Sequence, residues 1–166
     1  MLTVHDVQWV QDWDIHTMGT KVATKLQVVF DCADPARVAA FWEQALHYIS
    51  PDPPPPHSSW EDWARASGIP EQHWNDASSV EDPDDVGPRL FFQKVPEGKV
   101  AKNRMHLDLS VGGGPSVPLQ ERRSRVDAEV ARLTALGATD ERGAIEKQGE
   151  YWVRMNDPEG NEFCVQ

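Results

Sequence analysis

Cysteines, basic residues and long apolar runs are all scarce in this sequence of 166 residues. Only two cysteines occur, Cys32 and Cys164, so the chain has no disulfide framework. No run reaches the roughly 18 apolar residues that a membrane-spanning helix needs, and Met1 to Asp6 lack the basic and apolar regions of a secretory signal. The formal net charge of −11 disfavours general binding to nucleic acid. These absences predict a cytoplasmic protein that binds neither membranes nor nucleic acid.

The chain has enough length and enough apolar residues for one folded domain. Hydrophobic residues make up 39% of it, which separates it from disordered sequences. Residues 1–24 differ from the rest, because Trp9 and Trp13 stand in an otherwise polar stretch. This N-terminal arm is predicted either to dock its tryptophans on the domain or a second subunit, or to be flexible. Residues 25–166 are predicted to form the domain.

Each half of the domain begins with a strand that leads into an amphipathic helix. Residues 25–33 are rich in β-forming side chains. Asp34-Pro35 then supplies an N-cap and a first-turn proline for a helix that reaches about His47. The apolar positions of this helix have the spacing of one buried face: Val38, Phe41, Trp42, Ala45 and Leu46. In the second half, residues 105–111 predict a strand and residues 119–136 a helix that ends at Gly137.

The segments after the two helices predict an insertion and further strands. Prolines crowd residues 51–56, and Ser58 with Glu61 matches a capping box for a short helix through Trp60 and Trp63. The remaining strands are predicted over residues 77–81, 89–95, 138–146, 150–156 and 161–166.

The two halves also share their final turns, which indicates an internal repeat. Asp82-Pro83 precedes the last strand of the first half, and Asp157-Pro158 precedes the last strand of the second. Duplicated units of this kind predict an α+β fold of two βαβββ modules, whose curved mixed sheet surrounds a central cavity. Module one covers residues 25–97 with an insertion over 50–87, and module two covers residues 103–166.

Several motifs resemble those of the glyoxalase, bleomycin-resistance and extradiol dioxygenase proteins of the vicinal oxygen chelate superfamily. The likeness covers residues 25–166, and part of it is similar to a glyoxalase-like subgroup common in actinobacteria. The segments that carry it are Gln27 to Pro35 with Phe41-Trp42, Gly87 to Glu97, Lys102 to Leu109, and Asp157 to Val165.

The resemblance implies a metal site between the two modules. In metalloenzymes of the superfamily, side chains from the first and last strand of each module meet at one divalent cation such as Zn, Ni, Fe or Mn. The corresponding positions here are Gln27, Gln93, His106 and Cys164. No carboxylate is among them, neutral glutamines are weak ligands, and a cysteine must ionise to bind well. A divalent metal is one alternative for these four residues, but we expect that none binds. We also expect the Glu162 side chain to face away from that of Cys164.

Other residues are candidates for catalysis or for binding a substrate. His106 and Asp108 lie two apart and share one face of a strand, where they are either an acid–base pair or a satisfied structural pair. Gln27 and Gln93 either hydrogen-bond to each other or to a substrate, or bind a metal. A basic cluster either receives an anionic group or is held by acidic neighbours: Lys94, Lys99, Lys102 and Arg104. Trp60 and Trp63 either cover the cavity or anchor the insertion.

Two functions follow from this resemblance, and the sequence leaves both open. The first is a glyoxalase-like lyase, isomerase or dioxygenase that binds its substrate in the cavity. The second is a metal-free protein that sequesters a small molecule, as bleomycin-resistance proteins do. Either is expected to be a homodimer.

Overall fold

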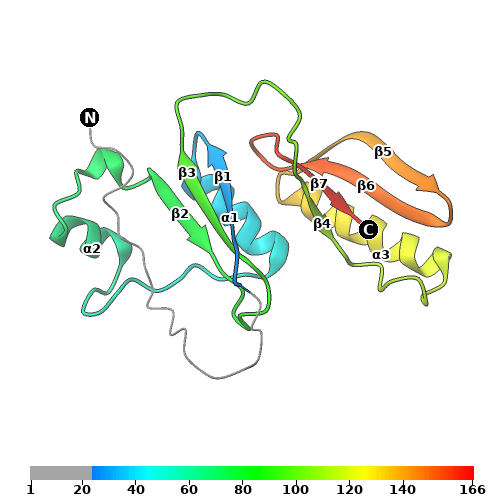
Figure 1. Cartoon of the computed structure of the whole chain (residues 1–166), viewed down its shortest axis with the longest axis horizontal. Coiled ribbons are helices and arrows are strands. Elements are labelled where there is room, and N and C mark those ends of the chain that lie inside the picture. The colour runs from blue at the N-terminus through cyan, green and yellow to red at the C-terminus, as the bar shows by residue number, and fades with distance from the viewer. Residues whose placement is uncertain (1–23) are drawn as a thin grey trace.

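The computed structural model describes residues 24–166, which fold into two β-sheets and the helices that cover them (Figure 1). The predicted N-terminal arm with Trp9 and Trp13 lies outside the described residues, except for its last residue. In the described part of the chain, no helix has the length and apolar character needed to cross a membrane.

The first module contains a three-stranded sheet and its covering helix. Strand β1 (Gln27–Cys32) runs parallel to β3 (Arg89–Lys94), and β2 (Ala77–Val80) pairs antiparallel with the other edge of β3. Helix α1 (Pro35–Leu46) begins as the sequence predicts, because the Asp34 side chain accepts a hydrogen bond from the Arg37 N–H at 3.3 Å.

One strand expected in this module is reduced to a single bridge, between Ile49 and Glu81. The proline-rich stretch after Ile49 explains the difference, since proline has no N–H to donate to a neighbouring strand. The insertion instead forms α2 (Trp60–Ala66) and the 3₁₀ turn η2 (Glu71–His73). The short helix is confirmed, but its N-cap is Ser59 and not Ser58: the Ser59 hydroxyl accepts from the Asp62 N–H at 3.1 Å.

The second module has the full set of strands. Its elements are β4 (Leu107–Leu109), α3 (Leu119–Ala135), β5 (Thr139–Lys147), β6 (Glu150–Asn156) and β7 (Glu162–Val165). The sheet order is β4-β7-β6-β5, in which only β4 and β7 are parallel. The order β1-β3-β2 of the first module matches β4-β7-β6, and only a counterpart of β5 is missing. The α+β fold of two related modules is therefore confirmed.

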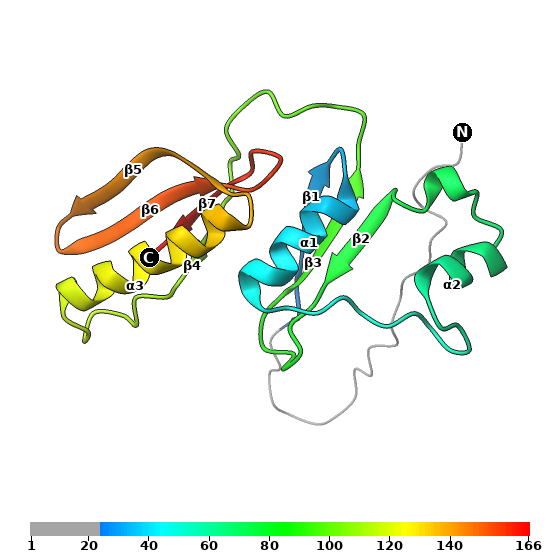
Figure 2. The same ribbon diagram turned by 180° about the vertical axis from the view of Figure 1, so that it is seen from behind.

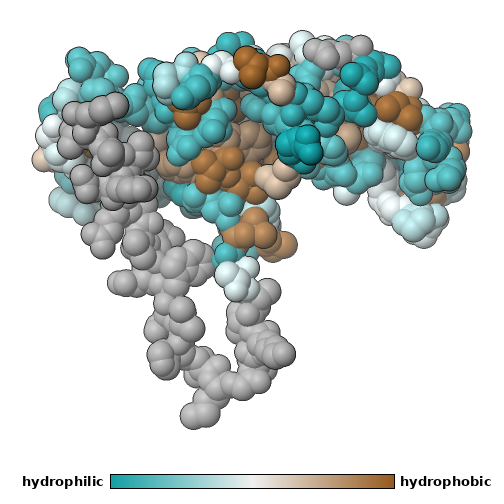
Figure 3. Space-filling view, turned by 45° about the horizontal axis from the view of Figure 1, so that its top comes forward, coloured by the Kyte–Doolittle hydropathy of each residue, from teal (hydrophilic) through white to brown (hydrophobic). Residues whose placement is uncertain are grey.

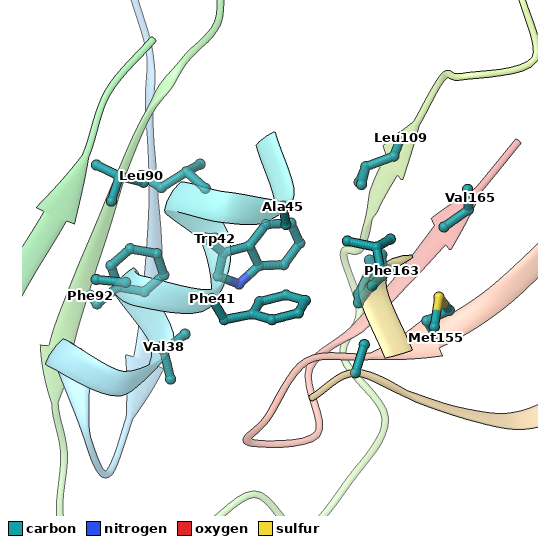
Figure 4. Close-up of a cluster of buried hydrophobic side chains, with 14 of the residues drawn as sticks. Val38, Phe41, Trp42, Ala45, Leu90, Phe92, Leu109, Met155, Phe163 and Val165 are labelled. Atoms are coloured by element: carbon teal, nitrogen blue, oxygen red, sulfur yellow. The ribbon is translucent and has the colours of Figure 1, made fainter. Parts of the chain in front are cut away.

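Helix α1 lies between the two halves and provides much of the core (Figure 4). Phe92 of the first sheet packs on one side of it, and Phe163 of the second sheet packs against its Trp42, with ring centroids 5.2 Å apart. Seen from behind, α1 and α3 lie in front of the two sheets, which share the opposite side of the molecule (Figure 2). The buried side chains from both modules form one cluster, so the modules are held together as a unit.

Polar contacts reinforce this junction at the final turn of the second module. The Asp157 carboxylate is 2% exposed and accepts a hydrogen bond from the Trp42 indole N–H at 3.2 Å. Glu159 accepts bonds of 2.7 Å from the backbone N–H groups of Ala33 and Asp34, where α1 begins. The turn therefore holds the start of α1 in place.

Candidate functional site

A cavity of about 480 Å³ opens between the free edge of β1 and the linker that leads into β4. Val28 and Phe30 on one face of β1 and Val29 on the other all line it, so the cavity follows the strand edge. Trp42 of α1 and Leu107 of β4 add further apolar walls. In Figure 3, apolar surface gathers near the middle of the molecule between hydrophilic flanks. The predicted hollow between the modules is thus present.

The polar side of this cavity comes mostly from the linker and from β7. The Glu162 carboxylate accepts bonds from the Lys99 ammonium at 2.9 Å and from the Asn103 N–H at 3.0 Å. The Asn103 amide also donates to the side-chain oxygen of Asn161 at 3.2 Å. These contacts fix the linker against the second sheet, so the shape of the cavity depends on Glu162.

The expectation that Glu162 faces away from Cys164 is wrong. Side chains alternate along a strand, so residues two apart share a face, and Glu162 lines the cavity.

Burial on its own would raise the pKa of Glu162, but hydrogen bonds from Asn103 and Lys99 outweigh it, and the net shift is downward. Glu162 is therefore a carboxylate at neutral pH, and its anionic form holds the linker.

Three potential ligand groups of the second module lie close together: the side chains of His106, Asp108 and Cys164. One ligand atom from each lies within 4.8 Å of the others. His106 Nδ1 is 3.6 Å from Asp108 Oδ1, too far for a hydrogen bond but close enough for an ion pair if the imidazole is protonated. Both side chains are exposed, and His106 also lines the cavity. Asp108 lies opposite Cys164 in the parallel pairing of β4 with β7.

The Cys164 sulfur is held in its protonated form. Burial raises the pKa of this thiol, and the nearby Asp108 carboxylate raises it further. The positive charges of Arg154 and Lys102 oppose this shift without reversing it. Cys164 is therefore a neutral thiol around pH 7 unless a cation displaces its proton.

The two glutamines of the predicted metal set are engaged elsewhere. Gln27 accepts a hydrogen bond from the Arg89 guanidinium, and Gln93 donates to the Asp31 carboxylate at 2.7 Å. Neither residue lines the cavity. Register explains their separation: Gln27 lies opposite Arg89, whereas Gln93 lies opposite Asp31, four residues further along β1 and about 13 Å away along the strand.

The corresponding residues of the second module differ in register by two positions. Cys164 lies opposite Asp108, and Asp108 is only two residues beyond His106 along the chain. The side chains of His106 and Cys164 therefore approach each other. The structure thus brings together the second half of the predicted metal set and keeps the first half apart. It also adds Asp108, which the sequence suggested only as a partner for His106.

The other predicted substrate contacts are divided between different surfaces. Arg104 lines the main cavity, together with Lys99, while Lys102 lines a smaller one. Trp60 and Trp63 pack against each other edge to face at 5.6 Å, and the Trp60 indole donates to the Pro51 carbonyl at 2.8 Å. Neither tryptophan lines the cavity, because α2 lies on the far side of β2 (Figure 1). In this structure both anchor the insertion and do not cover the cavity.

Several cavity residues were missed by the sequence analysis. Asn103 and Asn161 hold the linker, and Asp31 and Glu97 contribute carboxylates to the cavity wall. The sequence contained one signal that could have identified Asn161 as a cavity residue: it follows the Asp157-Pro158 turn that marks the repeat.

The fold is that of the vicinal oxygen chelate superfamily, and the sequence supports this assignment. A sequence model described as the glyoxalase-like domain matches residues 27–166, so the chain belongs to that family. No curated protein matches the chain in sequence.

Solved structures with the same fold include proteins of different activities. A glyoxalase/bleomycin resistance protein/dioxygenase family enzyme from Burkholderia phytofirmans is 15% identical, with a TM-score of 0.55 over 84% of this chain and 94% of its own. A fosfomycin resistance protein, FosX, from Listeria monocytogenes, complexed with Mn(II) and a dihydroxypropylphosphonic acid, is 13% identical, with a TM-score of 0.54 over 87% and 90%.

A lactoylglutathione lyase from Agrobacterium tumefaciens is also similar, with 13% identity and a TM-score of 0.50 over 87% of this chain and 92% of its own. At such low identities these likenesses establish the fold and do not transfer a reaction.

Proposed function

We propose that this protein binds a small amphipathic molecule in the cavity between β1 and β4. The observation that carries the proposal is a cavity of about 480 Å³ whose walls are apolar on the side of β1 and α1, and polar or charged on the side of the linker and β7. This volume lies within the range typical of small-molecule sites. The valines and Phe30 of β1 would bury the apolar part of the ligand.

In this proposal the rim residues orient the polar part of the ligand. Arg104 lines the cavity, is exposed, and forms no ion pair with any side chain in the described part of the chain, so its guanidinium can meet a carboxylate or another acceptor. His106, which lines the same cavity and lies beside Asp108, is the residue we propose as an acid or base if a reaction occurs there.

We propose that binding itself needs no metal. The four side chains implied by the superfamily do not come together, because Gln27 and Gln93 bond to other residues and lie at separate positions along the sheet. A ligand held by apolar contacts and hydrogen bonds requires only the cavity that is present. This favours a binding function of the bleomycin-resistance kind over the metal-dependent reactions of the superfamily.

A metal-assisted enzyme is the second candidate, and the three clustered groups of the second module favour it. His106, Asp108 and Cys164 offer a nitrogen, an oxygen and a sulfur, a set that suits Zn²⁺ better than the oxygen-preferring Mn²⁺. These residues would hold such an ion, which would act as a Lewis acid towards oxygen atoms of a ligand. Cys164 would have to lose its proton first, which costs free energy because its pKa is raised.

Thermal shift measurements with a panel of small amphipathic metabolites and drugs test the proposal. The variant Val29→Trp narrows the cavity along the edge of β1 from a side chain that is 48% exposed, so it should fold. The matched control is Val86→Trp, at an 86% exposed valine outside the cavity. We expect ligands that stabilise the wild type and the control but not Val29→Trp. Equal stabilisation of all three proteins would refute the proposed site.

Metal analysis of protein purified without chelators separates the two candidates. The metal-free proposal predicts ligand binding that is unchanged by EDTA and no stoichiometric metal. The alternative predicts bound Zn²⁺, or a related ion, that is lost in His106→Ala.

We also propose that the protein is a homodimer. Leu26 and Met105 are each 66% exposed, and large exposed apolar side chains are often covered in assemblies. Sedimentation velocity should give about twice the monomer mass, and a monomer at all concentrations would contradict the proposal.

A further inference from the structure

Three basic side chains from different segments meet on the second sheet, outside the main cavity. Lys102 comes from the linker, Arg142 from β5 and Arg154 from β6, and together they line a cavity of about 70 Å³. Asn156 and Glu162 complete the lining. Arg142 follows Asp140 at the irregularity in the pairing of β5 with β6, where the extra residues change the direction of the strand.

The positive charges of these three residues are not compensated by ion pairs. Among the side chains that the structure describes, which leave out Glu141, no carboxylate forms an ion pair with Lys102, Arg142 or Arg154. The one carboxylate in the lining, Glu162, already accepts bonds from Lys99 and Asn103. The cluster is therefore a local region of positive charge in a chain whose formal net charge is −11.

Other arginines of the same module behave differently, which gives a comparison within the protein. Arg122 and Arg123 of α3 pair with Glu150 and Glu146, and Arg132 pairs with Glu129 at hydrogen-bonding distance. These arginines of α3 are therefore neutralised by acidic side chains of their own module. The surplus positive charge at Lys102, Arg142 and Arg154 is available for an anion that does not belong to this part of the chain.

We propose that this smaller cavity binds a phosphate-type oxyanion. Two guanidinium groups and an ammonium can surround a tetrahedral dianion, since arginine matches such oxygens with paired N–H donors. Asn156 is 7% exposed and adds a neutral donor at the same place. The volume of about 70 Å³ is much smaller than the 480 Å³ of the main cavity, so it suits a small ion better than a whole metabolite.

The oxyanion is either free inorganic phosphate or the phosphate group of a phosphorylated molecule, and the chemistry of recognition is the same for both. The site is separate from the ligand site proposed above, although Glu162 lines both cavities. The proposal does not depend on the function assigned to the main cavity, because it uses different cations.

Isothermal titration of the full chain with inorganic phosphate at pH 7.5 and low salt tests this site. Arg154→Gln, Arg142→Gln and Lys102→Gln each remove one positive charge. Arg142 and Lys102 are exposed, so these two variants should fold even if Arg154→Gln does not. Lys147→Gln is the matched control, because Lys147 is an exposed cation of β5 that lines neither cavity.

We expect saturable binding in the wild type and the control, and an affinity about tenfold lower in each of the three variants, equivalent to about 1.4 kcal/mol. Acetate should bind less tightly than phosphate. Tighter binding of phenyl phosphate than of inorganic phosphate would assign the site to a phosphorylated ligand, and the reverse order would assign it to the free ion.

The absence of phosphate binding in the wild type, or equal binding in the wild type and all three variants, would overturn the proposal. The cavity-narrowing variant Val29→Trp should bind phosphate normally, so the two proposed sites can fail independently.

Discussion

Replacing Asp157 with alanine should destabilise the protein more than any other substitution in its turns. The carboxylate accepts four hydrogen bonds: from the backbone N–H groups of Glu159 and Asn161, from the Asn161 side chain and from the Trp42 indole. Trp42 is fully buried and Asn161 is 8% exposed, so water cannot easily replace the lost acceptor. Each buried donor left without a partner costs about 1–3 kcal/mol.

The expected total for Asp157→Ala is about 3–5 kcal/mol, a large part of the stability of an ordinary domain. With a urea m-value of about 2 kcal/mol/M, the unfolding midpoint should fall by about 2 M. Urea titrations followed by tryptophan fluorescence measure this directly, because Trp42 lies at the affected contact.

The repeat supplies a matched control at Asp82, the corresponding position of the first module. Within the described part of the chain, its carboxylate accepts bonds only from the backbone of its own turn, at Asp84, Val86 and Gly87. Asp82→Ala should therefore lower the midpoint much less than Asp157→Ala. If the two variants lost equal stability, the contact between the final turn and α1 would not be what holds the modules together.

Three further predictions concern the same junction, the linker and the cysteines. Glu159→Ala should lower the free energy of unfolding by about 1–2 kcal/mol in chemical denaturation, since the N–H groups of Ala33 and Asp34 lose their acceptor. Glu162→Gln should cost stability at pH 7 but progressively less below about pH 4.5, because the depressed pKa of Glu162 stabilises the fold only while the carboxylate is ionised; an equal loss at pH 3 and pH 7 would contradict this. Cys164, and even more Cys32, whose pKa is raised to about 12, should react with iodoacetamide at pH 7 only after unfolding, as mass spectrometry can follow.

The sequence predicted the helices and most strands because their signals are local. The Asp34-Pro35 start and the apolar spacing placed the first helix within a residue of its observed ends. The shared turns at Asp82 and Asp157 were enough to predict two related modules. Both signals depend only on neighbouring residues, so they can be read without knowing what lies next to them in space.

The parts that could not be predicted depend on pairing between distant segments. The separation of Gln27 from Gln93 follows from the register of β1 against β3, and no residue in either strand reveals that register alone. The basic cavity likewise requires the irregularity near Asp140, which brings Arg142 towards Arg154. The orientation of Glu162, in contrast, did follow from strand alternation, and the sequence analysis applied that rule wrongly.

The shortened first sheet has a consequence for how molecules of this protein meet one another. Among the described residues, the outer edge of β2 has no partner strand beyond the bridge at Ile49. Exposed edges can recruit strands from other chains. This one is only four residues long and is flanked by the acidic side chains of Asp76 and Glu81. A short edge with a carboxylate at each end is a poor template for a strand of a second molecule, so the loss of the fourth strand leaves little opportunity for association along this edge.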